Sequence, residues 1–243
     1  MPKGKQLIAG NWKMNGLRQD GVALARGIAE QARALHGCDL LVCPPATLLA
    51  AVGEVLAGSG VALGGQDCHA KASGAFTGSI SAEMLKDAGC SHGLVGHSER
   101  RHGLGESDAD VHEKTAALWR VGLVAIVCVG ETRAEREAGR AVEIVAGQLA
   151  GSVPAGATAD RLVIAYEPVW AIGTGLTPTL ADIAEIHNAI RGHTPTGTRI
   201  LYGGSVNPKN ASEILAIDGV DGALIGGASL QTADFCGIAE LCA

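Results

Sequence analysis

The sequence predicts a closed (β/α)8 barrel in a single α/β domain. Three observations lead to this fold class: eight strand-like apolar runs, segments of helical spacing between them, and the total length. Dividing 243 residues among eight units gives about 30 residues each, the size of one strand-plus-helix step. Strict alternation of strand and helix implies a parallel sheet. Eight such units in this length fit a closed barrel, and a doubly wound open sheet is the structural alternative.

The eight strand-like runs follow one another at regular intervals. Most are continuously apolar rather than alternating, as expected for parallel strands that are covered on both faces. The runs are Gln6–Gly10, Leu40–Cys43, Val61–Gly64, Gly93–Gly96, Val124–Gly130, Leu162–Tyr166, Arg199–Gly203 and Ala223–Gly226.

Between these runs, apolar residues recur at helical spacing. The clearest helical segments are Gly21–Leu35, Ser107–Arg120, Thr132–Leu149 and Leu180–Arg191. Ser107 is a capping residue, and acidic residues follow it, as at a helix N-terminus. No linker or low-complexity stretch divides the chain, so we expect residues 1–243 to form one domain.

Composition argues against several classes of function. Hydrophobic residues make up 47% of the chain, which excludes disorder, and the net charge of −6 with 3% aromatic residues argues against nucleic-acid and membrane-surface partners. The longest uncharged stretch, residues 144–159, is too short and too broken to cross a bilayer. The start lacks the apolar stretch of a signal peptide, and none of the seven cysteines forms a CxxC pair. We therefore expect a cytoplasmic protein with buried, reduced cysteines.

Common cofactor and nucleophile motifs are absent or misplaced. The chain has no GxxxxGK[ST] or HExxH motif, and Pro178 replaces the last glycine of a GxGxxG pattern that begins at Gly173. The stretch Gly89–Gly93 matches GxSxG, but it follows a helix-like segment and precedes a strand, the reverse of a nucleophile elbow. We therefore expect no cofactor and no metal.

Polar residues at strand ends are the catalytic candidates, because barrel active sites lie at the C-terminal ends of the strands. Asn11 and Lys13 follow the first run and, two residues apart in extended chain, point to one face. His97 follows the fourth run before a probable helix start, whose N–H groups lower a histidine pKa. Glu167 closes the sixth run. Taken singly, these could be a turn asparagine with a solvated lysine, a surface histidine and a capping carboxylate.

Two further features point to a phosphorylated substrate. Residues 168–175 combine small residues with Val169 and Trp170, which suits a mobile lid. Glycine pairs end the seventh and eighth runs, at Gly203–Ser205 and Gly226–Ser229, where barrels bind phosphate through backbone N–H groups. Close-packed turns are the alternative for each pair. Together with the strand-end residues, these features favour proton transfer on a small phosphorylated metabolite.

At these residues the chain resembles the triosephosphate isomerase family. The matching segments are Ala9–Asn15, Gly96–Arg101, Ala165–Gly175, Tyr202–Val206 and Leu224–Leu230, together with Gly74–Gly78 and Cys128–Glu131. They occur in family order and at family spacing. The resemblance implies a TIM barrel that interconverts dihydroxyacetone phosphate and D-glyceraldehyde 3-phosphate through an enediolate.

The resemblance also implies a role for each candidate. Glu167 would be the base, His97 the neutral electrophile and Lys13 the electrostatic stabiliser, a division of labour that is the standard description of this family. Asn11 would donate a hydrogen bond nearby, and Glu99 would pair with Lys13 and relay protons. The substrate would be bound by Asn11, Lys13, Gly173, Ser205, Gly226 and Gly227, under a lid formed by residues 168–178.

A homodimer is the expected assembly. The segment Gln66–Ser79 has no helical or strand period and carries Phe76, one of two phenylalanines. In the family this segment projects into an identical subunit, which would bring Thr77 near the partner's Asn11 and the partner's Lys13.

Two other functions fit parts of the pattern. A sugar-phosphate aldolase or another phosphate-binding barrel isomerase would share the fold, but an aldolase would need Lys13 as its Schiff-base lysine and would leave Glu167 without a role. A non-catalytic barrel that only binds a ligand would be expected to have lost Lys13, His97 or Glu167, and all three are present.

Overall fold

Eight parallel strands close into a barrel in the computed structural model, which describes residues 4–171 and 178–242. Each strand pairs with the next, and the last pairs with the first, so the predicted closed barrel is confirmed and the open sheet is excluded. The strands are β1 (Gln6–Asn11), β2 (Cys38–Cys43), β3 (Val61–Gly65), β4 (His92–Val95), β5 (Val124–Val129), β6 (Leu162–Tyr166), β7 (Arg199–Tyr202) and β8 (Gly222–Ile225). All eight overlap the predicted runs.

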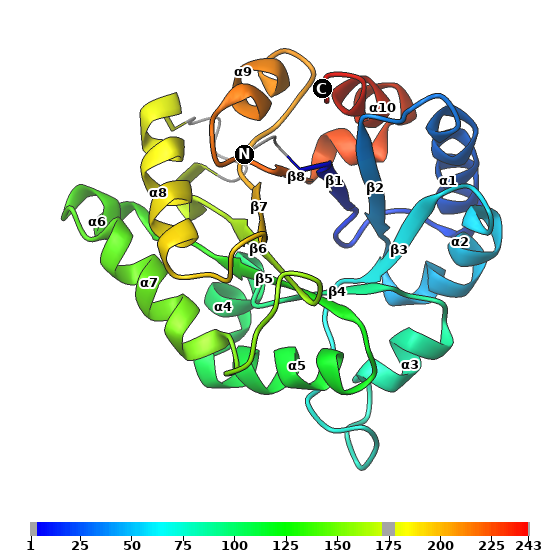
Figure 1. The fold of residues 1–243 in the computed structure, drawn as a ribbon. Helices are drawn as coiled ribbons and strands as arrows, with labels where there is room; N and C mark the ends of the chain where they lie inside the picture. Colours follow the sequence, from blue (N-terminus) through cyan, green and yellow to red (C-terminus); the bar gives the residue numbers. More distant parts are fainter. Residues whose placement is uncertain (1–3, 172–177, 243) are drawn as a thin grey trace.

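Helices surround this barrel as an outer ring, and the chain passes round the ring in sequence order (Figure 1). The α-helices are α1 (Arg18–Ala32), α2 (Leu49–Leu56), α3 (Ala82–Asp87), α4 (Ser98–Leu104), α5 (Asp108–Arg120), α6 (Arg133–Glu137), α7 (Ala141–Ser152), α8 (Leu180–Gly192), α9 (Ala211–Ala216) and α10 (Thr232–Ala239). Short 3-10 turns are η1 (Ala46–Leu48), η2 (Val169–Ala171) and η3 (Gly227–Leu230).

One predicted helix is wrong in its extent. The segment Thr132–Leu149 is not a single helix but two, α6 and α7. Gly139, between them, has a φ of +70°, the left-handed conformation that ends helices. By contrast, α5 begins as predicted, because the Ser107 hydroxyl accepts a hydrogen bond from the backbone N–H of Asp110.

The core has two layers, because successive side chains on a strand point to opposite faces. On β1, Leu7 and Ala9 point into the barrel, and Ile8 packs outward against the helices. The interior layer consists of Leu7, Ala9, Leu41, Cys43, Leu94, Ile126, Cys128, Val163, Ala165, Leu201 and Leu224. Six of the seven cysteines are buried and all are free thiols, as predicted.

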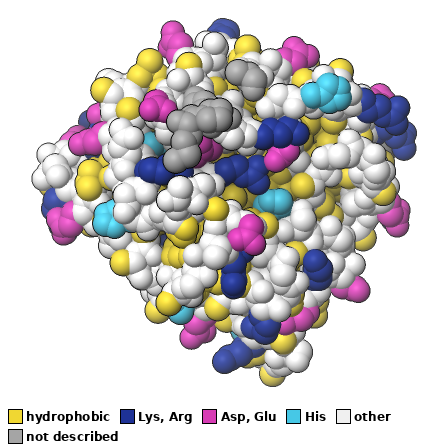
Figure 2. Space-filling view, viewed as in Figure 1, with side chains coloured by type: hydrophobic (Ala, Val, Ile, Leu, Met, Phe, Trp, Pro, Cys, Tyr) yellow, Lys and Arg dark blue, Asp and Glu magenta, His cyan; other side chains and the backbone are white. Residues whose placement is uncertain are grey.

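The segment between β3 and α3 stands out from this body. It corresponds to the predicted irregular region Gln66–Ser79, and it projects away from the helical ring (Figure 1). Its one ladder contact is an isolated bridge between His69 and Ser81. Basic and acidic side chains are interspersed on the face of the molecule shown in Figure 2. In the described parts of the chain, no helix has the length and apolar character needed to span a membrane.

Barrel closure generates the first prediction. Gly222 starts β8 with a φ of +139°, and a Cβ added there would lie 1.9 Å from the carbonyl oxygen of Leu7 on β1. We expect Gly222→Ala to destabilise the protein by about 3 kcal/mol or more, since both the backbone conformation and the strand pairing must change.

Gly237 in α10 is the matched control. A Cβ there meets nothing within 4 Å, so Gly237→Ala should stabilise the fold by about 0.5–1 kcal/mol. Thermal unfolding of the two variants beside the unmodified protein measures both effects. A Gly222→Ala protein with the same melting temperature as the unmodified protein would show that β1 and β8 tolerate separation.

Candidate active site

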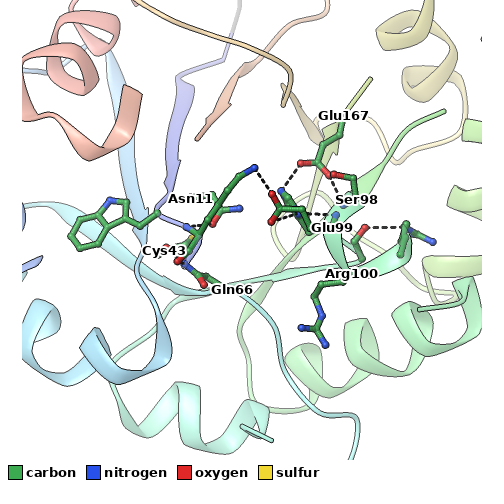
Figure 3. Close-up of polar contacts among 12 residues, drawn as sticks. Asn11, Cys43, Gln66, Ser98, Glu99, Arg100 and Glu167 are labelled. Atoms are coloured by element: carbon green, nitrogen blue, oxygen red, sulfur yellow. Dashed lines mark hydrogen bonds and ion pairs between the residues drawn. The ribbon is translucent and has the colours of Figure 1, made fainter. Parts of the chain in front are cut away.

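Two buried side chains meet at the C-terminal end of the barrel. His97 directly follows the β4 region and precedes α4, and Glu167 directly follows β6. The His97 Nε2 atom lies 2.8 Å from Glu167 Oε1, and the two residues are only 5% and 2% exposed. The backbone N–H of Ser98 donates a hydrogen bond of 2.9 Å to Glu167 Oε2 (Figure 3). Because Ser98 begins α4, the carboxylate also lies at a helix N-terminus, which favours its charged form.

The pKa of His97 differs from the sequence prediction. We expected it to be lowered, and burial does act in that direction, but the Glu167 carboxylate attracts and hydrogen-bonds the ring strongly enough to raise the pKa. Burial likewise acts to raise the pKa of Glu167, yet the contact with His97 lowers it. The prediction considered only the helix that follows His97 and omitted the carboxylate that faces it across the barrel mouth.

The other ring nitrogen of His97 fixes its tautomer. The backbone N–H of Glu99 lies 3.2 Å from His97 Nδ1 and donates to it. An acceptor at Nδ1 leaves the proton of the neutral imidazole on Nε2, where it points at Glu167. The Glu99 N–H thus opposes a second proton on the ring, whereas the carboxylates of Glu167 and Glu99 favour one.

Lys13 is held in an uncommon backbone conformation beside this pair. Its φ is +52°, in the left-handed region that costs energy for a residue with a side chain. The Asn11 side-chain oxygen accepts from the Lys13 N–H at 3.0 Å, and the Gln66 amide donates to the carbonyl oxygens of Lys13 and Cys43 at 2.8 and 2.9 Å. Figure 3 labels Asn11, Gln66 and Cys43 near one another. The Lys13 Nζ then reaches Glu99 Oε1 at 2.6 Å.

One cavity of about 530 Å³ collects most of the predicted residues. Asn11, Lys13, His97, Glu167, Ser205 and the Gly226–Gly227 pair all line it. A Cβ added to Gly226 would lie 3.5 Å from Lys13 Cε, which places the glycine pair next to the lysine. Glu99 lines a second cavity, of about 430 Å³, that also contains Lys13 and His97. Gly173 and most of the predicted lid lie outside the described residues.

A buried carboxylate that the sequence analysis gave no role holds the first turn after Glu167. Glu131 is fully buried, and its Oε1 accepts hydrogen bonds from the Tyr166 hydroxyl at 3.1 Å and the Trp170 indole N–H at 2.9 Å. Its carbonyl oxygen accepts from Val169 N–H at 3.1 Å. Burial raises the pKa of Glu131. The sequence signal was present in the matching segment Cys128–Glu131, but a motif match does not reveal what the side chain contacts.

This arrangement can carry out proton transfer at an anionic substrate. It offers a buried carboxylate, an imidazole N–H, an ammonium group and exposed backbone at a glycine pair. Within residues 4–171 and 178–242, no three His, Cys, Asp or Glu side chains are grouped so that they could hold a metal ion.

Comparisons with known proteins point to one family. The family model described as triosephosphate isomerase matches residues 6–242. The triosephosphate isomerase of Afipia carboxidovorans is 60% identical over 250 residues, covering 99% of this chain and 98% of the relative. That of Bradyrhizobium sp. (strain ORS 278) is 58% identical over 246 residues, with 98% of each covered. The crystal structure of triosephosphate isomerase from Bartonella henselae superimposes with a TM-score of 0.90 at 48% identity, covering 98% of both chains.

The contact between His97 and Glu167 generates a prediction about titration. Glu167→Gln removes the negative charge that raises the pKa of His97, so burial should then dominate and bring that pKa below about 6.5. In the unmodified protein it should lie above that value. Two-dimensional NMR of the histidine rings over a pH series measures both.

His92 is the internal control, because burial lowers its pKa to about 4 and the charged groups that act on it are Arg199 and Asp39, so Glu167→Gln should leave its titration unchanged. An unchanged His97 titration in Glu167→Gln would mean that the carboxylate does not control the ring.

Proposed function

This chain belongs to the triosephosphate isomerase family and interconverts dihydroxyacetone phosphate and D-glyceraldehyde 3-phosphate, and we propose that Glu167, His97 and Lys13 share that chemistry. The observation that carries the proposal is the buried contact between His97 and Glu167 beside Lys13. The reaction is an aldose–ketose isomerisation in glycolysis. Family membership sets aside the aldolase and the non-catalytic barrel as alternatives.

In this proposal the phosphate group selects the orientation of the substrate. The backbone N–H groups of Ser205, Gly226 and Gly227 bind it on one side of the cavity, with Gly173 from the lid. The carbonyl and hydroxyl oxygens then face His97 Nε2 and the Lys13 ammonium group. Asn11 supports the Lys13 turn and adds a polar contact in the same cavity.

Glu167 is the base that moves a proton between two carbons. It removes a proton from C1 of dihydroxyacetone phosphate, the electron pair of the broken C–H bond forms the C1–C2 double bond, and the carbonyl oxygen becomes the enediolate oxygen. His97 then moves the hydroxyl proton from O1 to O2, and return of the proton from Glu167 to C2 lets the O1 electron pair form the C1=O bond of the aldehyde. To reach the substrate, the carboxylate must leave the N–H of Ser98 and the ring of His97. These contacts therefore belong to the enzyme without bound substrate.

His97 and Lys13 stabilise the charge that develops on the substrate oxygens. When Glu167 turns away, His97 loses the nearer of the two carboxylates that favour its second proton and keeps the Glu99 N–H that opposes one. The ring then acts as a neutral imidazole whose Nε2–H donates to the substrate oxygens and shuttles protons between them. Lys13 supplies a full positive charge, and its partner Glu99 orients it and relays protons.

We also propose a two-fold homodimer built on the segment Gln66–Ser79, each chain being a single domain over residues 1–243 in the cytoplasm. The supports for the dimer are a projecting segment with exposed Thr77 and Phe76 42% exposed, and the cavity of about 430 Å³ next to Lys13. Met14, beside that cavity, is 95% exposed. In the dimer, Thr77 of each chain reaches the other chain's site near Asn11 and Lys13. The interface also covers the exposed apolar side chains of Met14 and Phe76.

Replacement of the base tests the assignment of Glu167. Glu167→Gln keeps the shape of the side chain and removes its basicity, so kcat should fall by at least about a thousandfold while KM changes little. Steady-state assays in both directions measure this. Glu213→Gln, an exposed carboxylate on α9, is the matched control and should retain full activity. A Glu167→Gln enzyme with normal kcat would remove the base from this mechanism.

The proposed homodimer is tested by measuring the mass of the protein in solution. Sedimentation at micromolar protein should give about 49 kDa, twice the 24.6 kDa chain. Dimerisation helps to hold Lys13, so activity should be lost as the dimer dissociates on dilution. A fully active species with the mass of one chain would contradict both the interface and its link to catalysis.

A further inference from the structure

A glutamine on the outer helical ring is paired with the backbone at the barrel mouth. Gln148 lies on α7, and its side-chain amide meets both polar groups of Gly130, the residue directly after β5. The Gly130 N–H donates to Gln148 Oε1 at 2.7 Å, and Gln148 Nε2 donates to the Gly130 carbonyl oxygen at 3.1 Å. A primary amide can make this two-way contact because it carries a donor and an acceptor side by side.

At Gly130 the chain leaves no room for a side chain between the end of β5 and Glu167. Val129, before it, accepts a hydrogen bond from the Glu167 N–H at 2.8 Å, and Glu131, after it, accepts from the Val169 N–H at 3.1 Å. A Cβ added to Gly130 would lie 1.7 Å from the Glu167 carbonyl oxygen. Residues 129–131 therefore lie in direct contact with residues 167–169, and any displacement of Gly130 must move the Glu167 backbone.

The two sides of this segment are held by different groups. Glu167 and Val169 donate to it from the β6 side, and Gln148 fills the hydrogen-bonding capacity of Gly130 from the helical side. Arg101 adds a neighbouring restraint, since its guanidinium donates to the carbonyl oxygens of Gly96 and Cys128. Of these groups, Gln148 is the one whose side chain binds the residue packed against the base.

We propose that Gln148 is a positioning residue for Glu167, acting through Gly130. It touches neither the substrate cavity nor the reacting atoms, and it fixes the backbone from which the base reaches the substrate. This inference rests on the proposed role of Glu167. A displacement of about 1 Å in a catalytic group is enough to cost a large factor in rate.

The exposure of Gln148 separates a positioning role from a merely structural one. The side chain is only half-buried, so water can replace its hydrogen bonds when it is removed. The loss of stability should then be small. Water does not restore the fixed position of the Gly130 backbone, because mobile water molecules do not hold Gly130 in one place.

The test uses two variants of the full-length enzyme and one control. Gln148→Met keeps the length of the side chain and removes both hydrogen bonds. Gln148→Glu keeps an acceptor for the Gly130 N–H and places a charge against the Gly130 carbonyl oxygen. Gln31→Met, at an exposed glutamine on α1, repeats the first substitution away from the site.

For Gln148→Met we expect kcat to fall by about tenfold or more, with KM within about twofold and a melting temperature within a few degrees of the Gln31→Met control. In D2O, a larger fraction of the product should carry solvent deuterium, because a displaced base returns its proton more slowly and exchanges it more often. This fraction is counted per turnover, so a loss of folded enzyme does not change it. Gln148→Glu should show the same change in partition.

The outcomes distinguish a positioning role of Gln148 from a merely structural one. Normal kcat and normal deuterium partition in Gln148→Met overturn the positioning role, and so does a lower rate with unchanged partition, which would mean fewer folded molecules. If Gln148→Met fails to fold, the partition measured in Gln148→Glu decides in the same way. The parallel Glu167→Gln assay tests the base itself, so its failure would be recognised separately.

Discussion

The contact between His97 and Glu167 is the interaction around which the site is built. These residues follow β4 and β6, which are separated in the barrel by β5, so their side chains can meet only over the end of β5. That end is made by Gly130, whose missing side chain lets the backbone of Glu167 approach. The contact also sets the electrostatics, since each partner shifts the pKa of the other against the effect of burial. Ser98, Glu99 and Lys13 are then arranged around this pair.

The sequence predicted those features that depend on a local pattern of residues. All eight strands could be predicted because continuous apolar runs separated by turns are local patterns, and Asn11, Lys13, His97 and Glu167 could be found because they end such runs. The direction of the His97 pKa could not, because it depends on a carboxylate about 70 residues later in the chain. Glu131 and Gln148 were missed for a related reason. Their contacts with an indole and with a glycine backbone leave no periodicity or spacing in the sequence.

The backbone conformation that places the Lys13 charge is locally unfavourable, and neighbouring side chains stabilise it. A positive φ at a residue with a side chain is unfavourable, and here the Asn11 and Gln66 side chains hold Lys13 by two hydrogen bonds, while a third joins Gln66 to Cys43 at the end of β2. Gln66 starts the same segment whose far end projects from the barrel. The turn that orients Lys13 and the segment proposed to contact a second subunit are therefore continuous, so the proposed assembly and the geometry of the site would be physically linked.

The pairing of β8 with β1 has a consequence for biosynthesis. Lys13 follows β1 and is translated before the rest of the barrel, whereas the glycine pair beside it, Gly226 and Gly227, follows β8, the last strand of the barrel. Until β8 has been made, a nascent chain therefore holds Lys13, His97 and Glu167 without the glycine pair that lines the same cavity. The cavity is therefore complete only once β8 has docked between β7 and β1.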